Sequence, residues 1–188
     1  MENGPNRKKQ PEEVRRKLLD SAASLAVEQG LASVSIQAVA DAAGVTKGGL
    51  FHHFPNRQAL IDAVSQDLLA QLDVEIDRHL LADKGGRGTF TRAYVRAMFD
   101  DRALGSKSPW AALTMSLIAD PGSSRAWDAW LNARLVRHAA TDSGTLLEVV
   151  RLAADGAWLA QVVRPDGGAD SSDVALIAQL MAMTEEGA

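Results

Sequence analysis

Apolar residues recur along this chain at the three- and four-residue spacing of α-helices, and no stretch alternates in the manner of a β-strand. The longest series runs from Leu60 to Leu80 at four-residue intervals and predicts one helix of about 25 residues, which Asn56 can cap. Glycine and proline mark the ends of the other helical segments. The pattern therefore predicts an all-α fold of about nine helices.

Residues 35–54, SIQAVADAAGVTKGGLFHHF, contain two short helical patterns separated by a glycine. Ser35 can cap the first helix, and Gly44 can end it in a left-handed conformation that other residues rarely adopt. Thr46 can cap the second helix, which is predicted to run from Lys47 to about Phe54. The spacing predicts a helix-turn-helix, and the alternative is a plain antiparallel helix pair.

The second of these helices has an outward face that suits the major groove of DNA. The residues predicted to be buried are Leu50, Phe51 and Phe54. Those predicted to face outward are Lys47, Gly48, Gly49, His52 and His53. A lysine near the helix start can donate to guanine, and glycines let the backbone approach the duplex. In a plain helix pair the two glycines would only destabilise the helix, by about 1 kcal/mol each relative to alanine.

The segment GVTKGGLFHHF at 44–54, followed by PNRQAL, closely resembles the DNA-binding domain of TetR-type transcriptional regulators, over about residues 11–64. The resemblance implies a three-helix DNA-binding domain at 11–56 and a C-terminal domain for effector binding and dimerisation at 57–188. It also implies that Lys47, Gly48, Gly49 and His52 face bases or the adjoining backbone. The remaining residues implied to contact DNA, mostly at phosphates, are Ser35, Gln37, Thr46, His53 and Arg57.

Two positions depart from the pattern of that family. The family usually has tyrosine where Phe51 stands, so one phosphate contact is missing here. It commonly has Thr, Ser, Ala or Asn where Gly49 stands, so one base-reading side chain is missing. The missing phosphate contact affects how strongly DNA is bound, and the missing side chain affects how much of the DNA sequence is read.

The charge distribution modestly supports DNA binding. The net charge is −4, but residues 1–60 hold eight Lys and Arg against six Asp and Glu, and the acidic excess lies beyond them. A DNA-binding protein needs a basic surface only where it contacts DNA. Residues 1–10 include the basic run Arg7-Lys8-Lys9 and are predicted to form a flexible arm, either a solubilising tail or an arm that follows DNA.

The sequence shows no apolar run of membrane-spanning length, no signal-peptide pattern and no cysteine. We therefore expect a cytoplasmic protein without a membrane partner. The four histidines lack the spacing of a helical metal site, and GxSxG, Walker and Rossmann motifs are missing. We expect no metal, no cofactor and no enzymatic activity.

Two C-terminal helices, predicted at about 145–163 and 172–183, are rich in small and aliphatic residues on more than one face. One face can pack on the rest of the chain, and the other on a second copy in a four-helix dimer interface. The resemblance implies the same pairing. The alternative is a pair of helices buried in the core of a monomer.

Aromatic residues collect in the second half, since all four tryptophans and the only tyrosine lie beyond residue 90. They suggest an apolar pocket for an uncharged or weakly polar effector, although they could instead simply fill the core. The candidate lining residues are Tyr94, Met98, Trp110, Met115, Trp127, Trp130 and Trp158.

The resulting interpretation is a repressor that binds a palindromic DNA operator as a homodimer and is released by a small-molecule effector. One alternative is a ligand-independent architectural DNA-binding protein. The other is an enzyme in which the helix pair is incidental.

Overall fold

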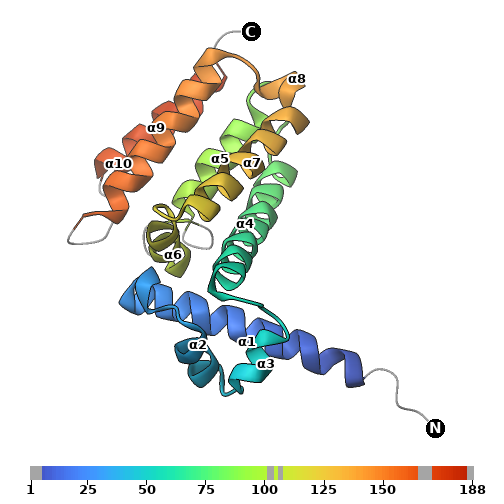
Figure 1. Cartoon of the computed structure of the whole chain (residues 1–188). Helices are drawn as coiled ribbons and strands as arrows, with labels where there is room; N and C mark the ends of the chain where they lie inside the picture. The colour runs from blue at the N-terminus through green and yellow to red at the C-terminus, as the bar shows by residue number, and fades with distance from the viewer. Residues whose placement is uncertain (1–5, 101–103, 106–107, 165–170, 186–188) are drawn as a thin grey trace. The chain divides into compact units, whose positions relative to one another are not determined.

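The computed structural model describes residues 6–100, 104–105, 108–164 and 171–185, and within these ranges the chain is helical without any β-strand (Figure 1). The first elements are α1 Asn6–Gln29, the 3-10 turn η1 Leu31–Ser33, α2 Ile36–Ala43, α3 Lys47–Phe51, α4 Arg57–Leu81 and α5 Thr89–Phe99. The later elements are α6 Pro109–Leu117, α7 Pro121–Arg137, α8 Ala139–Asp142, α9 Thr145–Val162 and α10 Ser171–Met183. The predicted all-α class is confirmed.

The described residues form ten α-helices, one more than the sequence predicts. The additional helix is α8, in a region predicted to belong to the end of the preceding helix. His138 interrupts that helix, because its backbone has φ −104 and ψ 17. Its ring instead stacks on Phe90 with the ring centroids 5.1 Å apart. The two C-terminal helices predicted from the sequence are therefore α9 and α10.

Helix α1 begins at Asn6, within the predicted flexible arm, and Pro11 lies inside the helix. Proline has no backbone N–H, and inside the helix it removes the bond that residue 11 would donate to the carbonyl of residue 7. The arginine, lysines and glutamine at 7–10 are good helix formers and favour the extra turn. Residues 6–10 of the predicted flexible arm are thus helical, and residues 1–5 lie outside the described residues.

The chain divides into two compact units, the first comprising residues up to Asp67 together with 115–126. In this unit α1 packs against η1 and α2, and α2 packs against α3. The core includes the fully buried Leu18, Val39 and Leu50. Arg16 joins α1 to α4 through two hydrogen bonds of 2.6 and 2.8 Å to the Asp67 carboxylate. These contacts hold the two short helices on the longer ones.

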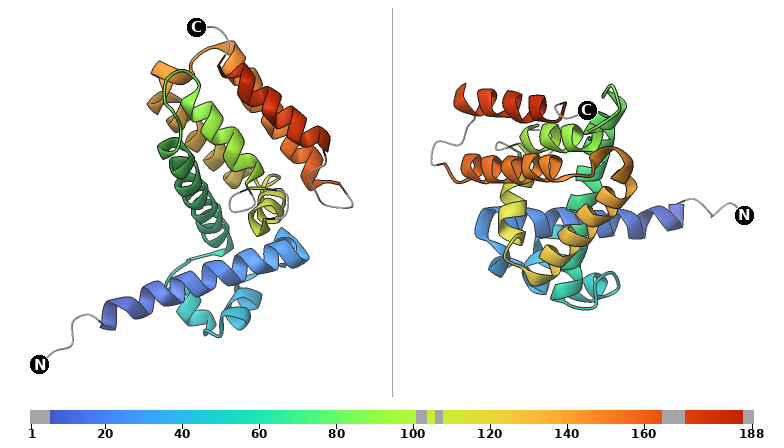
Figure 2. Two further views of the ribbon diagram at one scale, coloured as in Figure 1. Left: turned by 180° about the vertical axis from the view of Figure 1, so that it is seen from behind. Right: turned by 90° about the horizontal axis from the view of Figure 1, so that it is seen from above.

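The second unit comprises residues 68–114 and those from 127 on, and α5 is its central helix. Helix α5 packs against α8, α9 and α10, and α9 packs against α10 (Figure 2). Most of α5 is buried, so other elements cover it on nearly every side. Val95 of α5 forms an apolar cluster with Val150 and Ala154 of α9 and Leu180 of α10.

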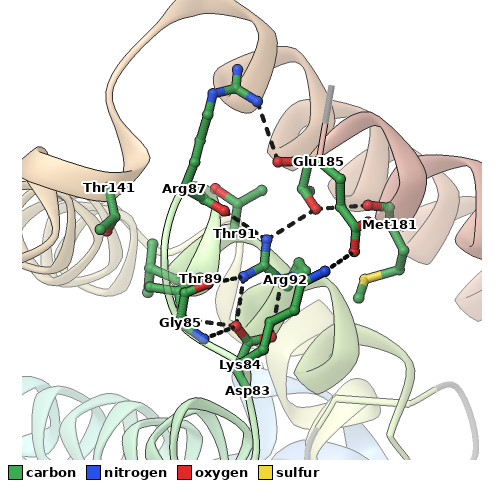
Figure 3. Close-up of polar contacts among 12 residues, drawn as sticks. Asp83, Lys84, Gly85, Arg87, Thr89, Thr91, Arg92, Thr141, Met181 and Glu185 are labelled. Atoms are coloured by element: carbon green, nitrogen blue, oxygen red, sulfur yellow. Dashed lines mark hydrogen bonds and ion pairs between the residues drawn. The ribbon is translucent and has the colours of Figure 1, made fainter. Parts of the chain in front are cut away.

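A buried ion pair joins the loop after α4 to α5 in this unit (Figure 3). The Asp83 carboxylate accepts hydrogen bonds from Nε of Arg92 at 2.9 Å and from its Nη2 at 2.5 Å. Their side chains are only 1% and 2% exposed. Arg92 also donates to the hydroxyl of Thr184 at 3.4 Å, just beyond α10. One guanidinium therefore connects the loop after α4 and the start of α5 to a residue some ninety positions further along the chain.

The hydrogen bonds from Arg92 hold the pKa of the Asp83 carboxyl well below its ordinary value. A depressed carboxyl pKa adds stability above the unfolded-state pKa of about 3.9, and this contribution is lost as the pH falls. The ion pair should therefore stabilise the fold at neutral pH and weaken under acidic conditions.

We expect Arg92→Met to lower the free energy of unfolding by about 3 kcal/mol, because it leaves Asp83 with only the partly exposed Arg96 as a cationic partner. Urea unfolding followed by circular dichroism at pH 7 measures this loss. Lys84→Met is the control, since it removes the cation of an exposed pair with Glu185 and should change nothing measurable. The difference between wild type and Arg92→Met should shrink as the pH falls below about 4. Equal stability at pH 7 would contradict this account.

Candidate nucleic-acid interface

Two hydroxyl side chains start the helices of the predicted helix-turn-helix. The Ser35 hydroxyl accepts a 3.1 Å hydrogen bond from the backbone N–H of Ala38, and the Thr46 hydroxyl accepts one of 3.0 Å from Gly49. Both predicted caps are confirmed. A hydroxyl that accepts one hydrogen bond still has a proton to donate. Each exposed side chain can therefore cap its helix and also donate to a phosphate.

The corner between α2 and α3 depends on the conformation of Gly44. Its φ of +67 is left-handed, and the N–H of Val45 returns to the carbonyl of Ala40 at 3.0 Å. This bond satisfies a carbonyl at the end of α2 while the chain turns toward α3. A residue with a Cβ would strain this backbone, so glycine is required at position 44.

The outward face of α3 carries few side chains. Lys47, Gly48 and His52 are exposed, while Leu50 is fully buried. A Cβ added at Gly48 would meet nothing within 4 Å, so packing within the described chain does not require glycine there. At Gly49, which is half-buried, an added Cβ would lie 3.2 Å from the Thr46 hydroxyl. The small residues leave the start of α3 open to close approach by another molecule.

The prediction that Phe51 is buried is wrong, because its side chain is 43% exposed. Leu50 points to the core, and the next residue lies about 100° further around a helix. Helix α3 ends at Phe51, and the inward aromatic contact is made instead by Phe54, which is 2% exposed. Phe51 therefore lies beside the outward face and adds an apolar surface that the periodicity misplaced.

Arg57, which is predicted to contact a phosphate, also makes two hydrogen bonds to backbone carbonyls of its own chain. Its Nε donates to the carbonyl of Val34, and its Nη2 to the carbonyl of Leu31, both at 2.6 Å. The guanidinium thus ties the start of α4 to the turn that precedes α2. This scaffolding contact joins residues more than twenty positions apart, so local spacing could not reveal it.

The remaining predicted DNA contacts lie on the same unit. Gln37 is exposed on α2 and donates to the carboxylate of Asp41 at 2.8 Å. His53 is half-buried, and its ring lies 6.4 Å from the ring of Phe54. Arg15 of α1 places its guanidinium 4.7 Å from the centre of the same ring. The Phe54 ring, just after the end of α3, is therefore contacted by both His53 and Arg15.

A polar cavity of about 380 Å³ lies in the first unit, between the beginning of α4 and the beginning of α7. Its lining residues are Gln58, Asp62, Ser65, Gln66, Asp120, Pro121, Gly122, Arg125 and Ala126. Asp120 caps α7, and hydrogen bonds led by the backbone N–H of Ser123 lower the pKa of its carboxyl. None of the seven predicted pocket residues lines this cavity.

The predicted pocket residues lie on several different helices. Tyr94 and Trp158 are buried on α5 and α9, where they donate to the Asp155 carboxylate and to the carbonyl of Leu104, each at 2.6 Å. Met98 is also buried on α5. The remaining four are partly buried elsewhere: Trp127 and Trp130 pair on α7, Trp110 lies on α6, and Met115 belongs to the first unit.

Within the described ranges, no helix is long and apolar enough to cross a membrane. The same residues include no group of three or more histidines or carboxylates that could hold a metal ion.

This geometry defines a helix-turn-helix DNA-binding protein, and comparisons with known proteins identify its family. Residues 18–64 match the family described as bacterial regulatory proteins, tetR family, and residues 88–185 match the tetracyclin repressor-like C-terminal domain. The second match alone covers more than half of the chain. The chain belongs to the TetR family of transcriptional regulators.

Individual relatives share different parts of the chain. The HTH-type transcriptional repressor KstR2 of Rhodococcus jostii is 40% identical over 58 residues, which are 31% of this chain and 28% of that protein. The chain thus matches less than a third of the length of that relative. The HTH-type transcriptional regulator BetI of Escherichia coli O157:H7 is 28% identical over 159 residues, which cover 77% of this chain and 80% of BetI.

Solved structures share the fold. A TetR-family member from Streptomyces coelicolor has a TM-score of 0.71 at 21% identity, covering 92% of this chain and 98% of that one. The multidrug binding protein EbrR, solved with malachite green, also has a TM-score of 0.71, at 18% identity and with 90% and 97% of the two chains covered. At these identities the likeness supports the fold alone.

We expect Lys47→Ala and Arg57→Ala to weaken DNA binding in different ways. Lys47→Ala should lower the preference for operator over random DNA by about 1–3 kcal/mol and leave the melting temperature unchanged, since Lys47 is exposed. Arg57→Ala should weaken binding to both DNAs alike and also lower the melting temperature, because two hydrogen bonds to the turn before α2 are lost.

Fluorescence anisotropy at about 150 mM salt and thermal melts separate the two effects. Wild-type affinity in both variants would show that α3 and the start of α4 are not the DNA-binding surface. An unchanged melting temperature for Arg57→Ala would contradict only the scaffolding role.

Proposed function

We propose that the chain is a repressor that binds a palindromic operator as a homodimer and leaves it when a small molecule binds to the second unit. The observation that carries this proposal is the α2–corner–α3 geometry, which exposes Lys47 and Gly48 at the start of a capped helix. The start of a helix is the part that approaches base edges in the major groove. KstR2, which resembles part of this chain, is itself described as a repressor.

The proposed DNA contacts divide into two kinds. Lys47 and His52 reach bases from the outward face of α3, and Gly48 allows close approach. The hydroxyls of Ser35 and Thr46, together with Arg57, Gln37 and His53, contact the backbone. Base contacts carry sequence information and phosphate contacts carry affinity, so Lys47 and His52 determine the operator sequence. The second glycine of α3, Gly49, leaves few side chains for base reading.

The proposed dimer uses the exposed faces of α9 and α10. Large apolar side chains remain accessible there, with Leu152 and Val163 of α9 at 63% and 60% exposure and Val174 of α10 at 64%. Neighbouring Leu159 and Leu176 are 42% and 41% exposed. Apolar residues gathered on two adjacent helices are typical of a protein interface. A second copy presents the same surface, so two-fold pairing covers both.

The proposed effector site lies at the packed faces of α5 and α9, where Tyr94, Met98 and Trp158 supply large buried side chains. EbrR, whose fold this chain shares, is described as a multidrug binding protein. We propose that α4 carries the signal, because this helix continues without a break from Arg57 to Leu81. A ligand empties the operator only if it binds the DNA-free form more tightly than the DNA-bound form.

Selection of bound sequences from a random DNA pool by the purified full-length protein tests the proposed function. We expect enrichment of an inverted repeat, since a two-fold dimer presents two copies of α3. Enrichment of single half-sites would exclude the dimeric operator, and no enrichment would exclude a sequence-specific regulator. Retention of the operator by every compound in a metabolite library would favour the ligand-independent alternative. Turnover of a substrate by the isolated protein would favour an enzyme.

We expect Leu152→Glu to dissociate the dimer at micromolar concentration. The substitution would bury a carboxylate in the apolar interface, close to its symmetry mate, at a cost of several kcal/mol. Light scattering during size exclusion gives the mass directly. The matched control is Leu81→Glu at the end of α4, where an 89% exposed leucine lies outside the proposed interface. A wild-type monomer, or equal dissociation by both variants, would contradict the α9–α10 interface.

A further inference from the structure

Three arginines of the second unit are almost fully buried, and one of them lacks a carboxylate partner. Arg92 pairs with Asp83, and Arg134 pairs with Asp73 and Asp77 at 2.5 and 2.7 Å. Arg151 of α9 is only 7% exposed, yet its side chain makes one hydrogen bond, from Nη1 to the hydroxyl of Thr91 at 2.6 Å. Among the described residues, no carboxylate lies within ion-pair distance of Arg151.

A buried cation without a counter-charge is costly, because the interior does not replace the water that solvates it. Burial lowers the pKa of the Arg151 guanidinium below its ordinary value, against the attraction of Asp142, Glu148 and Asp155 acting through space. The through-space attraction of these carboxylates therefore does not offset the loss of solvent. The guanidinium also keeps N–H groups beyond the single bond to Thr91.

Two of the three carboxylates whose charge acts on Arg151 are engaged elsewhere, and the third, Glu148, is exposed. Asp155 lies one helical turn further along α9, but its carboxylate accepts a 2.6 Å hydrogen bond from the Tyr94 hydroxyl. Burial raises the pKa of the Asp155 carboxyl above its ordinary value. Asp142 caps α5 by accepting from the backbone N–H groups of Phe90 and Thr91 at 3.1 and 2.7 Å. Neither side chain is placed to neutralise Arg151 directly.

A second buried side chain of α9 carries a donor without an acceptor. Gln161 is 2% exposed, and its side-chain Nε2 has no hydrogen-bond partner. It lies ten residues beyond Arg151, which corresponds to about 15 Å along the helix. Trp158, between them in the sequence, is also buried, at 4% exposure. Within the described part of the chain, Arg151 without a carboxylate partner and Gln161 with an unbonded amide donor leave the buried part of α9 incompletely satisfied.

We infer that Arg151 binds the carboxylate of a small organic monoanion. One negative charge balances one guanidinium, whereas a phosphate dianion would leave a buried negative charge. This inference rests on the proposed effector site and names the chemical class of its ligand. It differs from the uncharged ligand that the aromatic composition alone suggests.

The first test needs no ligand. Replacing an unneutralised buried cation with an apolar side chain should stabilise the fold, whereas breaking a buried ion pair should destabilise it. We expect Arg151→Met to raise the melting temperature of the full-length protein and Arg92→Met to lower it. A loss of stability in Arg151→Met as large as that in Arg92→Met would show that Arg151 is structural and overturn the inference.

The second test uses phenylacetate, benzoate and octanoate, each paired with its primary amide. We expect at least one carboxylate to raise the melting temperature and change tryptophan fluorescence, while its amide does not. Arg151→Met should weaken that binding about ten- to hundredfold, the loss of a charge-assisted hydrogen bond. Arg125→Met, at an exposed arginine of the other unit, should bind as wild type does.

Equal responses to carboxylate and amide, no response to any carboxylate, or binding that survives Arg151→Met would each overturn the inference. Operator affinity is measured in parallel without ligand and then with the binding carboxylate. Carboxylate binding that leaves operator affinity unchanged would overturn its role as effector. A protein that binds no operator would overturn the proposed function, while Arg151-dependent carboxylate binding would still stand.

Discussion

The second unit depends on the neutralisation of cations inside a helical core. Arg92 brings together the loop after α4, the central helix α5 and the residues beyond α10, because only Asp83 and nearby carbonyls and hydroxyls satisfy its donors. Arg134 does the same for α7 and α4 through Asp73 and Asp77. Each pair is costly to break, since the partner would stay buried and charged. Arg151 differs from these two arginines because it has no carboxylate partner among the described residues, and this free charge is the one we propose to bind a ligand.

The first unit obtains its rigidity from backbone contacts and leaves its outward face free. Ser35, Gly44 and Thr46 satisfy helix ends within α2 and α3, and Arg57 bonds carbonyls of the preceding turn. None of these contacts uses the outward side of α3. Substitutions there can therefore change which DNA is bound without changing the fold, and the open space at Gly48 is consistent with that separation.

Helix α9 serves two proposed roles on opposite faces. Its inward side carries Arg151, whose missing carboxylate partner indicates a ligand, and its outward side carries Leu152 and Val163, whose exposure indicates a second copy. A ligand that shifts α9 would therefore act on the proposed dimer contact as well as on α5. Stability and function oppose each other at Arg151, because the unpaired charge that favours ligand binding weakens the empty protein.

The sequence by itself determined most of the helices, the helix-turn-helix and the family resemblance, because caps and turns act on backbone groups only a few residues away, as Ser35 and Gly44 do. It misplaced Phe51 and did not reveal the bonds of Arg57, because burial and long-range pairing depend on the other segments. Helix spacing also permits an ion pair between Arg151 and Asp155, four residues apart. Only the tertiary structure shows that Tyr94 of another helix bonds the Asp155 carboxylate and that Arg151 is left without a counter-charge.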